Sequence, residues 1–92
     1  MNRRITLNRC YGGFSLSDWA VEMLGLSSPY DDIARDNAML AAMVELYPTE
    51  TAGKCARLEV VKIPARATDW QIFEYDGMET LAVVVDGKIV TM

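Results

Sequence analysis

Two Asp-Gly pairs, ten residues apart near the end of this 92-residue chain, constrain the fold more than any other feature. They are Asp76-Gly77 and Asp86-Gly87, and both are flanked by β-branched and aromatic residues. Asp-Gly is typical of two-residue β-hairpin turns, because both central positions of such a turn need a positive φ. The sequence therefore predicts an antiparallel meander with strands at Trp70–Tyr75, Glu79–Val85 and from Lys88 onward.

Counting outward from the two turns tests the meander. Two-residue turns bring apolar side chains onto one face through the pairs Trp70–Val83, Ile72–Leu81, Val83–Val90 and Leu81–Met92. One pair conflicts with this register, because Glu74 then stands directly opposite Glu79, and facing like charges are unfavourable. We therefore expect the first turn to be longer than two residues.

The first two thirds of the chain add one strand, two helices and another strand. Ile5–Asn8 alternates apolar and polar residues, Ser17 can cap a helix that Gly25 ends, and Asp32 or Asp36 can cap a second helix that Pro48 stops. Thr49–Lys54 is a connector, and Leu58–Ile63 is a strand rich in β-branched residues.

These elements predict one α+β domain over residues 1–92. Two helices would pack on one face of an antiparallel sheet of four to five strands, in the order β-α-α-β-β-β-β. Trp70 is expected to anchor the hydrophobic core of this domain. The predicted core comprises Trp19, Met23, Leu40, Met43, Val44, Leu58, Val60, Trp70, Ile72, Leu81, Val83 and Val90, with turns at Gly12, Gly13, Gly77 and Gly87.

Composition narrows the classes of function. The chain is 51% hydrophobic, and 9 basic residues against 13 acidic ones give a net charge of −4 with no histidine. Without histidine, the usual general base is missing, so we expect neither an enzyme nor a cofactor. Cys10 and Cys55 are too few for a disulfide scaffold or a structural zinc site and should be free thiols. The first residues lack the apolar stretch of a secretory signal, and no segment is apolar enough to span a membrane.

The segment Cys10–Phe14 allows a chemical interpretation and a structural one. A thiolate beside exposed backbone N–H groups could serve acyl transfer, and paired glycines before a helix could form an anion nest. Because the chain offers no histidine partner for the thiol, a tight strand-to-helix turn is favoured. The acidic residues Asp31, Asp32 and Asp36 are explained by helix capping rather than by a metal site.

The basic residues are unevenly distributed. Arg3, Arg4 and Arg9 give the first seventeen residues a charge of +3, which leaves −7 on the remainder. Arginine binds phosphate through charge-assisted, bidentate hydrogen bonds. The alternative is an edge strand that charge protects from aggregation. The candidate phosphate-contacting residues are Arg3, Arg4, Arg9, Arg35, Lys54 and Arg66.

Two blocks of sequence resemble a widespread family of small bacteriophage proteins. The first runs from Cys10-Tyr11-Gly12-Gly13-Phe14 to Ser17, with Ala20-Val21-Glu22 after it. The second, within a match over positions 10–80, comprises Cys55-Ala56, Leu58, Val60, Ile63-Pro64, Trp70, Ile72 and Glu74-Tyr75-Asp76-Gly77 with Glu79. The arginine-rich start and small acidic body also look like a type I-F anti-CRISPR protein. The family motif itself implies no particular functional residues.

The resemblance implies a stoichiometric inhibitor in the host bacterial cytoplasm. Such a protein would bind the type I-F crRNA-guided surveillance complex (Csy, or Cascade) through its protein subunits and crRNA backbone, and would block hybridisation to target DNA. It would need no membrane and no small-molecule substrate. Two alternatives stay open: a phage host-takeover protein that binds one host protein without RNA, and a small Cys- or carboxylate-dependent enzyme.

Overall fold

The helices and strands follow the predicted order, with one short helix added. The structure, a computed structural model, describes residues 3–92. Its elements are β1 (Arg3–Asn8), α1 (Asp18–Leu24), α2 (Ala38–Leu46), α3 (Pro48–Thr51), β2 (Leu58–Ile63), β3 (Ala67–Tyr75), β4 (Met78–Val85) and β5 (Lys88–Thr91). The α+β class is therefore confirmed. Among the described residues, none of these helices has the length and apolar character needed to cross a membrane.

Both Asp-Gly pairs form the tight turns that the sequence predicts. The φ angles are 50° and 90° at Asp76 and Gly77, and 52° and 75° at Asp86 and Gly87. The strands form a sheet of order β3-β4-β5, and all four predicted pairs are present in it. The expectation of a longer first turn is wrong, because Glu74 does stand opposite Glu79.

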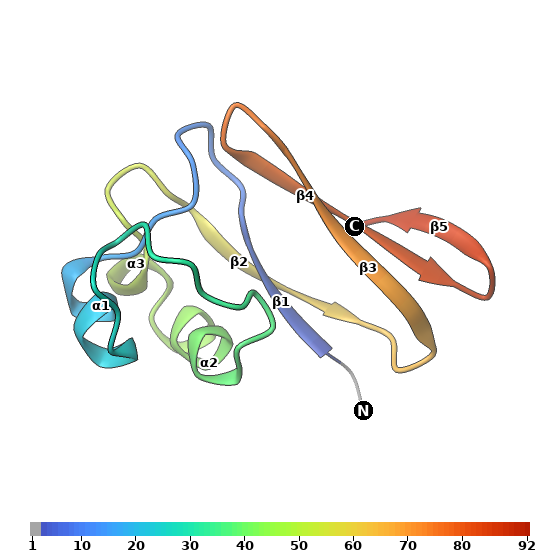
Figure 1. Ribbon diagram of the computed structural model, residues 1–92, viewed down its shortest axis with the longest axis horizontal. Coiled ribbons are helices and arrows are strands. Elements are labelled where there is room, and N and C mark those ends of the chain that lie inside the picture. Colours follow the sequence, from blue (N-terminus) through green and yellow to red (C-terminus); the bar gives the residue numbers. More distant parts are fainter. Residues whose placement is uncertain (1–2) are drawn as a thin grey trace.

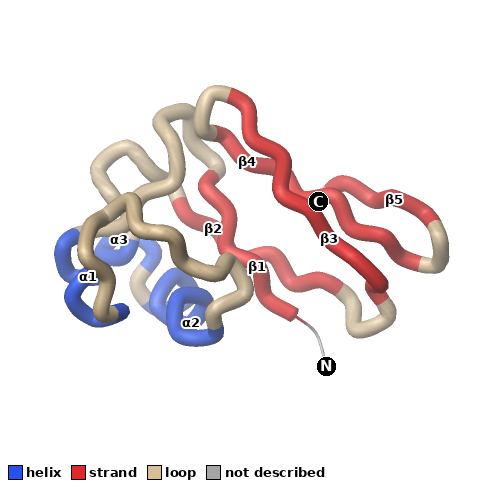
Figure 2. Tube along the Cα trace, in the orientation of Figure 1, coloured by secondary structure: helices blue, strands red, loops and turns tan. Residues whose placement is uncertain are grey.

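The strands form two antiparallel sheets, not the single sheet that we expected. β1 pairs with β2 in a two-stranded ribbon, separate from the three-stranded sheet. This ribbon lies between the helices and the three-stranded sheet (Figures 1 and 2). One of its faces packs Leu58 against helical residues such as Leu40, and the other packs Ile5 against Leu81. Each face of the ribbon thus has its own hydrophobic cluster.

Burial confirms most of the predicted core and corrects part of it. Six of the residues are buried: Leu40, Met43, Val44, Leu58, Leu81 and Val83. Val60, Trp70 and Ile72 are partly buried against the two clusters. The prediction is wrong for Trp19, Met23 and Val90, which are 39%, 49% and 46% exposed. The seven-residue α1 buries only Ala20. All four residues of β5 are exposed, and Val90 is not part of the cluster that contains Val83.

The helix ends follow ordinary capping rules, with two corrections. The Ser17 side chain accepts a hydrogen bond from the Ala20 N–H, and Gly25 closes α1 with φ 69°, as predicted. α2 is capped by Asn37 and not by Asp32 or Asp36. Pro48 does not only stop α2 but occupies the first turn of α3, a position that proline favours. Part of the expected connector is therefore helical.

Trp70 should contribute strongly to stability, although it is not fully enclosed. Its ring packs against the cluster that contains Leu81 and Val83. Full removal of a buried aromatic costs about 3–5 kcal/mol, and partial exposure places Trp70→Ala near the lower end of that range. Urea denaturation followed by circular dichroism should show the loss. Trp19→Ala is the control, and an equal effect of both changes would contradict the assignment of Trp70 to the core.

Candidate functional site

The six cations proposed as phosphate contacts are dispersed, and most have internal partners. Arg3 and Lys54 are exposed, and neither forms an ion pair within residues 3–92. They lie at opposite ends of the β1–β2 ribbon, since Arg3 pairs with Ile63 and Lys54 precedes Leu58. The other four are held by carboxylates, in the pairs Arg4–Glu45, Arg9–Glu59, Arg35–Glu79 and Arg66–Asp86.

Arg35 is an internal structural residue, which corrects its proposed role as a phosphate contact. Its guanidinium donates to both carboxylate oxygens of Glu79, at 2.5 and 2.8 Å, and to the Thr6 carbonyl at 3.3 Å. It also stacks on the Phe14 ring, 3.7 Å from the centroid. Three of its five N–H donors and one face of its plane are therefore already occupied.

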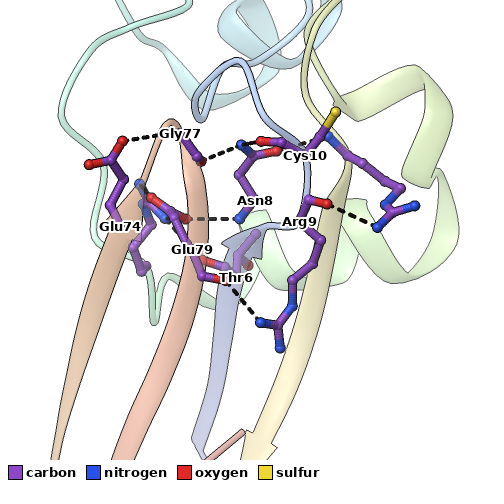
Figure 3. A network of polar contacts seen from close by, with 9 residues as sticks. Thr6, Asn8, Arg9, Cys10, Glu74, Gly77 and Glu79 are labelled. Carbon is purple, nitrogen blue, oxygen red and sulfur yellow. Dashed lines mark hydrogen bonds and ion pairs between the residues drawn. The ribbon is translucent and has the colours of Figure 1, made fainter.

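The Arg35–Glu79 pair covers the open edge of β1. The Thr6 N–H donates to the Arg35 carbonyl at 2.8 Å, and the Asn8 N–H donates to Glu79 Oε1 at 2.8 Å. Figure 3 shows the Glu79 carboxylate beside Asn8 at the end of this strand. Strand edges need such cover, because unpaired backbone groups recruit other strands. A carboxylate from β4 thus covers the free edge of β1.

The side chain of Asn8 connects three segments. Its Nδ2 donates to the Cys10 and Gly77 carbonyls, both at 2.7 Å, and its Oδ1 accepts from the Arg57 N–H at 2.9 Å. These bonds join the end of β1, the start of β2 and the β3–β4 turn (Figure 3). Asn8 is fully buried, so each of these polar groups depends on its partner for satisfaction.

The two blocks of the sequence motif meet in space. The Gly12 N–H donates to the Asp76 carbonyl at 3.2 Å. A Cβ on Gly77 would lie 2.1 Å from the Gly13 nitrogen, and one on Gly12 would lie 2.9 Å from the Cys55 carbonyl oxygen. A side chain at position 77 would collide with the Gly12-Gly13 turn, and one at position 12 would collide with the backbone of Cys55. Gly12 and Gly77 are therefore needed for the close packing of these segments.

The same contacts argue against an acyl-transfer site at Cys10. Its neighbouring donor, the Gly12 N–H, is already bonded to Asp76 and is not free to stabilise an oxyanion. Cys10 is half-buried and Cys55 is exposed, and both are free thiols. The structural interpretation of Cys10–Phe14 as a strand-to-helix turn accounts for these residues.

Separate hydrogen-bond donors resolve the conflict between Glu74 and Glu79. Glu79 turns toward Arg35, while Glu74 accepts a hydrogen bond from the Gly77 N–H at 2.5 Å. Each carboxylate thus has its own donor, and their repulsion does not lengthen the turn. The burial of Glu79 could not be found from sequence, because its arginine lies 44 positions away.

The sheet β3-β4-β5 leaves its outer surface uncovered. The face opposite the core carries Phe73, Tyr75, Ala82, Val84 and Ile89, with Tyr11 beside it, and we call these residues the outer sheet face. Phe73, Tyr75, Ile89 and Tyr11 are 53%, 75%, 75% and 62% exposed. Alternation in the two hairpins could have identified this second apolar face.

Two shallow hollows cross the outer sheet face and meet at Phe73. One, of about 200 Å³, lies between Tyr11 and Tyr75, and the other, of about 140 Å³, lies between Phe73 and Ile89. Glu74 lines the first hollow and Asp69 the second, whereas no lysine or arginine of the described chain lines either one. The surface is apolar with an acidic border.

Comparison of the chain with protein-family models, with curated proteins and with solved structures gave no match. The resemblance to small bacteriophage proteins therefore stays a prediction from the sequence motifs.

Proposed function

We propose that this protein acts by stoichiometric binding to another protein, and that the outer sheet face is its docking surface. The observation that supports this is the exposure of Phe73, Tyr75 and Ile89 on one side of a single sheet. Aromatic and aliphatic side chains of this size supply much of the binding energy at interfaces once a partner removes them from water. Two hollows around Phe73 give a partner's side chains room to insert.

The partner that we propose is the type I-F crRNA-guided surveillance complex of the host bacterial cytoplasm, which the motif resemblance implies. Charge supports this choice, because the chain carries −4 and its outer sheet face has an acidic border. Proteins that bind RNA and DNA present cationic surfaces to phosphates. An acidic protein with an apolar centre is complementary to such a surface and would displace target DNA from it.

Contacts with protein subunits are better supported than contacts with crRNA phosphate. Four of the six candidate cations already pair with carboxylates of this chain, and a phosphate would have to compete with them. The same observation favours the alternative of a single host protein bound without RNA. Ribonuclease treatment of the complex before capture separates the two targets, because only the surveillance complex would be lost with its RNA.

Phe73→Lys should abolish most of the inhibition while the fold persists. The change places a cation in the centre of the outer sheet face, where loss of a central anchor costs about 2 kcal/mol or more, or roughly 30-fold in affinity. The measurement is the electrophoretic mobility of labelled target DNA with purified complex and increasing amounts of this protein. Leu46→Lys is the control, because Leu46 is 71% exposed on α2, away from this sheet.

Undiminished DNA binding at a large molar excess of the unaltered protein would reject the inhibitor proposal. Equal inhibition by the Phe73 and Leu46 variants would instead move the docking surface elsewhere. If Arg3→Ala with Lys54→Ala removes the inhibition while Phe73→Lys does not, the phosphate-contact mechanism is the correct one.

A further inference from the structure

β5 is the least covered strand of the molecule. Ile89, on the outer side of the sheet, is 75% exposed, and Val90, on the inner side, is 46% exposed. β4 is the one element against which this strand packs extensively, and the β4–β5 hairpin projects from the body (Figure 1). An apolar strand that is open on both faces and along one edge is a site for the addition of another strand.

The free edges of β1 and β3 are protected, and β2 carries the charged residues Glu59 and Lys62. β1 is closed by the Arg35–Glu79 pair, as described above. β3 has an irregular register between Ala67 and Asp69 and carries acidic side chains, both of which discourage pairing. β5 has no bulge and no proline, and Lys88 is its single charge. The edge cover of β1 and the irregular register of β3 have no counterpart in β5.

We propose that β5 pairs antiparallel with β5 of a second copy of this chain, so that two sheets join into one of six strands. The backbone pattern determines the register. Met92 exchanges hydrogen bonds with Leu81, at 2.7 and 3.3 Å, so Lys88 and Val90 also face β4, while Ile89 and Thr91 point their N–H and C=O groups outward. A two-fold axis at Val90 then pairs each Ile89 with Thr91 of the other copy through four hydrogen bonds.

The charges of the chain are compatible with this pairing. Lys88 would face Met92 of the second copy, so no like charges meet at the seam, and Asp86 is already paired with Arg66. The acidic residues Asp69 and Glu74 lie on β3, which becomes the outermost strand on each side. The two β3 strands would be about 24 Å apart at a strand spacing of 4.8 Å, well beyond the screening length of about 8 Å. The net charge of −4 therefore does not oppose association at this edge.

The small apolar area on β5 limits the affinity of the dimer. Its apolar contacts come chiefly from Ile89, Val90 and Met92, which are 75%, 46% and 37% exposed. Such a strip is smaller than the roughly 800 Å² per partner of a standard stable interface. We therefore expect a monomer–dimer equilibrium in the micromolar range, not a permanent dimer. It would place two outer sheet faces side by side, and it does not depend on the proposed target.

Sedimentation velocity of the full chain from low micromolar to near-millimolar concentration tests the proposal. The weight-average mass should rise toward twice that of the monomer. Thr91→Pro should abolish the rise, because it removes an outward N–H without breaking a bond to β4, whereas Thr91→Val keeps that N–H and should preserve dimerisation. Circular dichroism verifies that both variants are folded.

Amide hydrogen exchange provides a readout of the register. With increasing concentration, exchange of the Ile89 and Thr91 amides should slow, while the Val90 amide is protected by the hairpin at every concentration. A monomer at all concentrations would overturn the proposal. Dimerisation that survives Thr91→Pro but is lost in Phe73→Lys would also overturn it, because the contact would then be the outer sheet face.

Discussion

Replacing Glu79 with alanine should cost this protein about 3–5 kcal/mol of folding free energy, the range for removal of one partner from a buried ion pair. Glu79 is 5% exposed, and its carboxylate accepts hydrogen bonds from Arg35 and from the Asn8 N–H. Its loss leaves a half-buried guanidinium without a counter-charge and the edge of β1 without its acceptor. The free energy of unfolding of a typical domain is about 5–15 kcal/mol in total, so much of the Glu79→Ala protein should be unfolded at a modest urea concentration.

Glu59→Ala is the matched control, because Glu59 also pairs with an arginine but has a side chain that is 58% exposed. Exposed pairs contribute about 1 kcal/mol or less, so its urea midpoint should move little. Glu79→Gln should lie between the two, since the amide oxygen can still accept from the Asn8 N–H while the charge is lost. If Glu79→Ala and Glu59→Ala give the same midpoint, the Arg35–Glu79 pair is not what joins the hairpin to β1.

Local signals predicted the strands and two helices of the fold, but not the short helix α3. The Asp-Gly pairs predicted the positions of both turns and the register of three strands, because a two-residue turn leaves one pairing available. The longer first turn that we expected from the Glu74–Glu79 pair was wrong. Ser17 and Gly25 marked the ends of α1 for equally local reasons. What these signals could not predict was the division into two sheets. That division depends on which faces pack together, and both faces of β1 are buried, including Thr6 and Asn8.

The candidate site was less predictable, because its contacts join distant parts of the sequence. A pattern of arginines suggests phosphate only while their partners are unknown, and Glu45, Glu59, Glu79 and Asp86 lie between 20 and 50 positions from the arginines they bind. Glu79 lies close to the turn at a hairpin tip, a position where side chains are usually exposed to solvent. It is buried because the Gly12-Gly13 turn and Arg35 cover that tip, and neither contact follows from local sequence.

The contact between the two sequence blocks gives their residues a role in packing. The Gly12-Gly13 turn rests on the Asp76-Gly77 turn, so the glycines of both blocks are explained by the contact between the two turns. The outer sheet face takes Tyr11 and Tyr75 from these blocks but Phe73, Val84 and Ile89 from outside them, so the docking surface that we propose is only partly made of block residues.

The twin hairpin turns allow this contact to be measured. Gly77 and Gly87 both follow an aspartate in the same turn conformation, with φ of 90° and 75°. A Cβ on Gly87 would meet no atom within 4 Å, whereas a Cβ on Gly77 would lie 2.1 Å from the Gly13 nitrogen and 2.8 Å from the Gly12 nitrogen. Gly87→Ala should therefore cost only the backbone strain of a left-handed residue, about 1–2 kcal/mol.

Gly77→Ala should cost that strain plus the displacement of the Gly12-Gly13 backbone, since overpacking adds about 1–3 kcal/mol or more. We expect its loss of unfolding free energy to exceed that of Gly87→Ala by roughly 2 kcal/mol, with a correspondingly lower urea midpoint. The shift should be accompanied by faster exchange of the Gly12 amide, whose acceptor is the Asp76 carbonyl. Equal midpoints for the two variants would mean that the turns do not press on each other, and the motif would then need an explanation in function and not in folding.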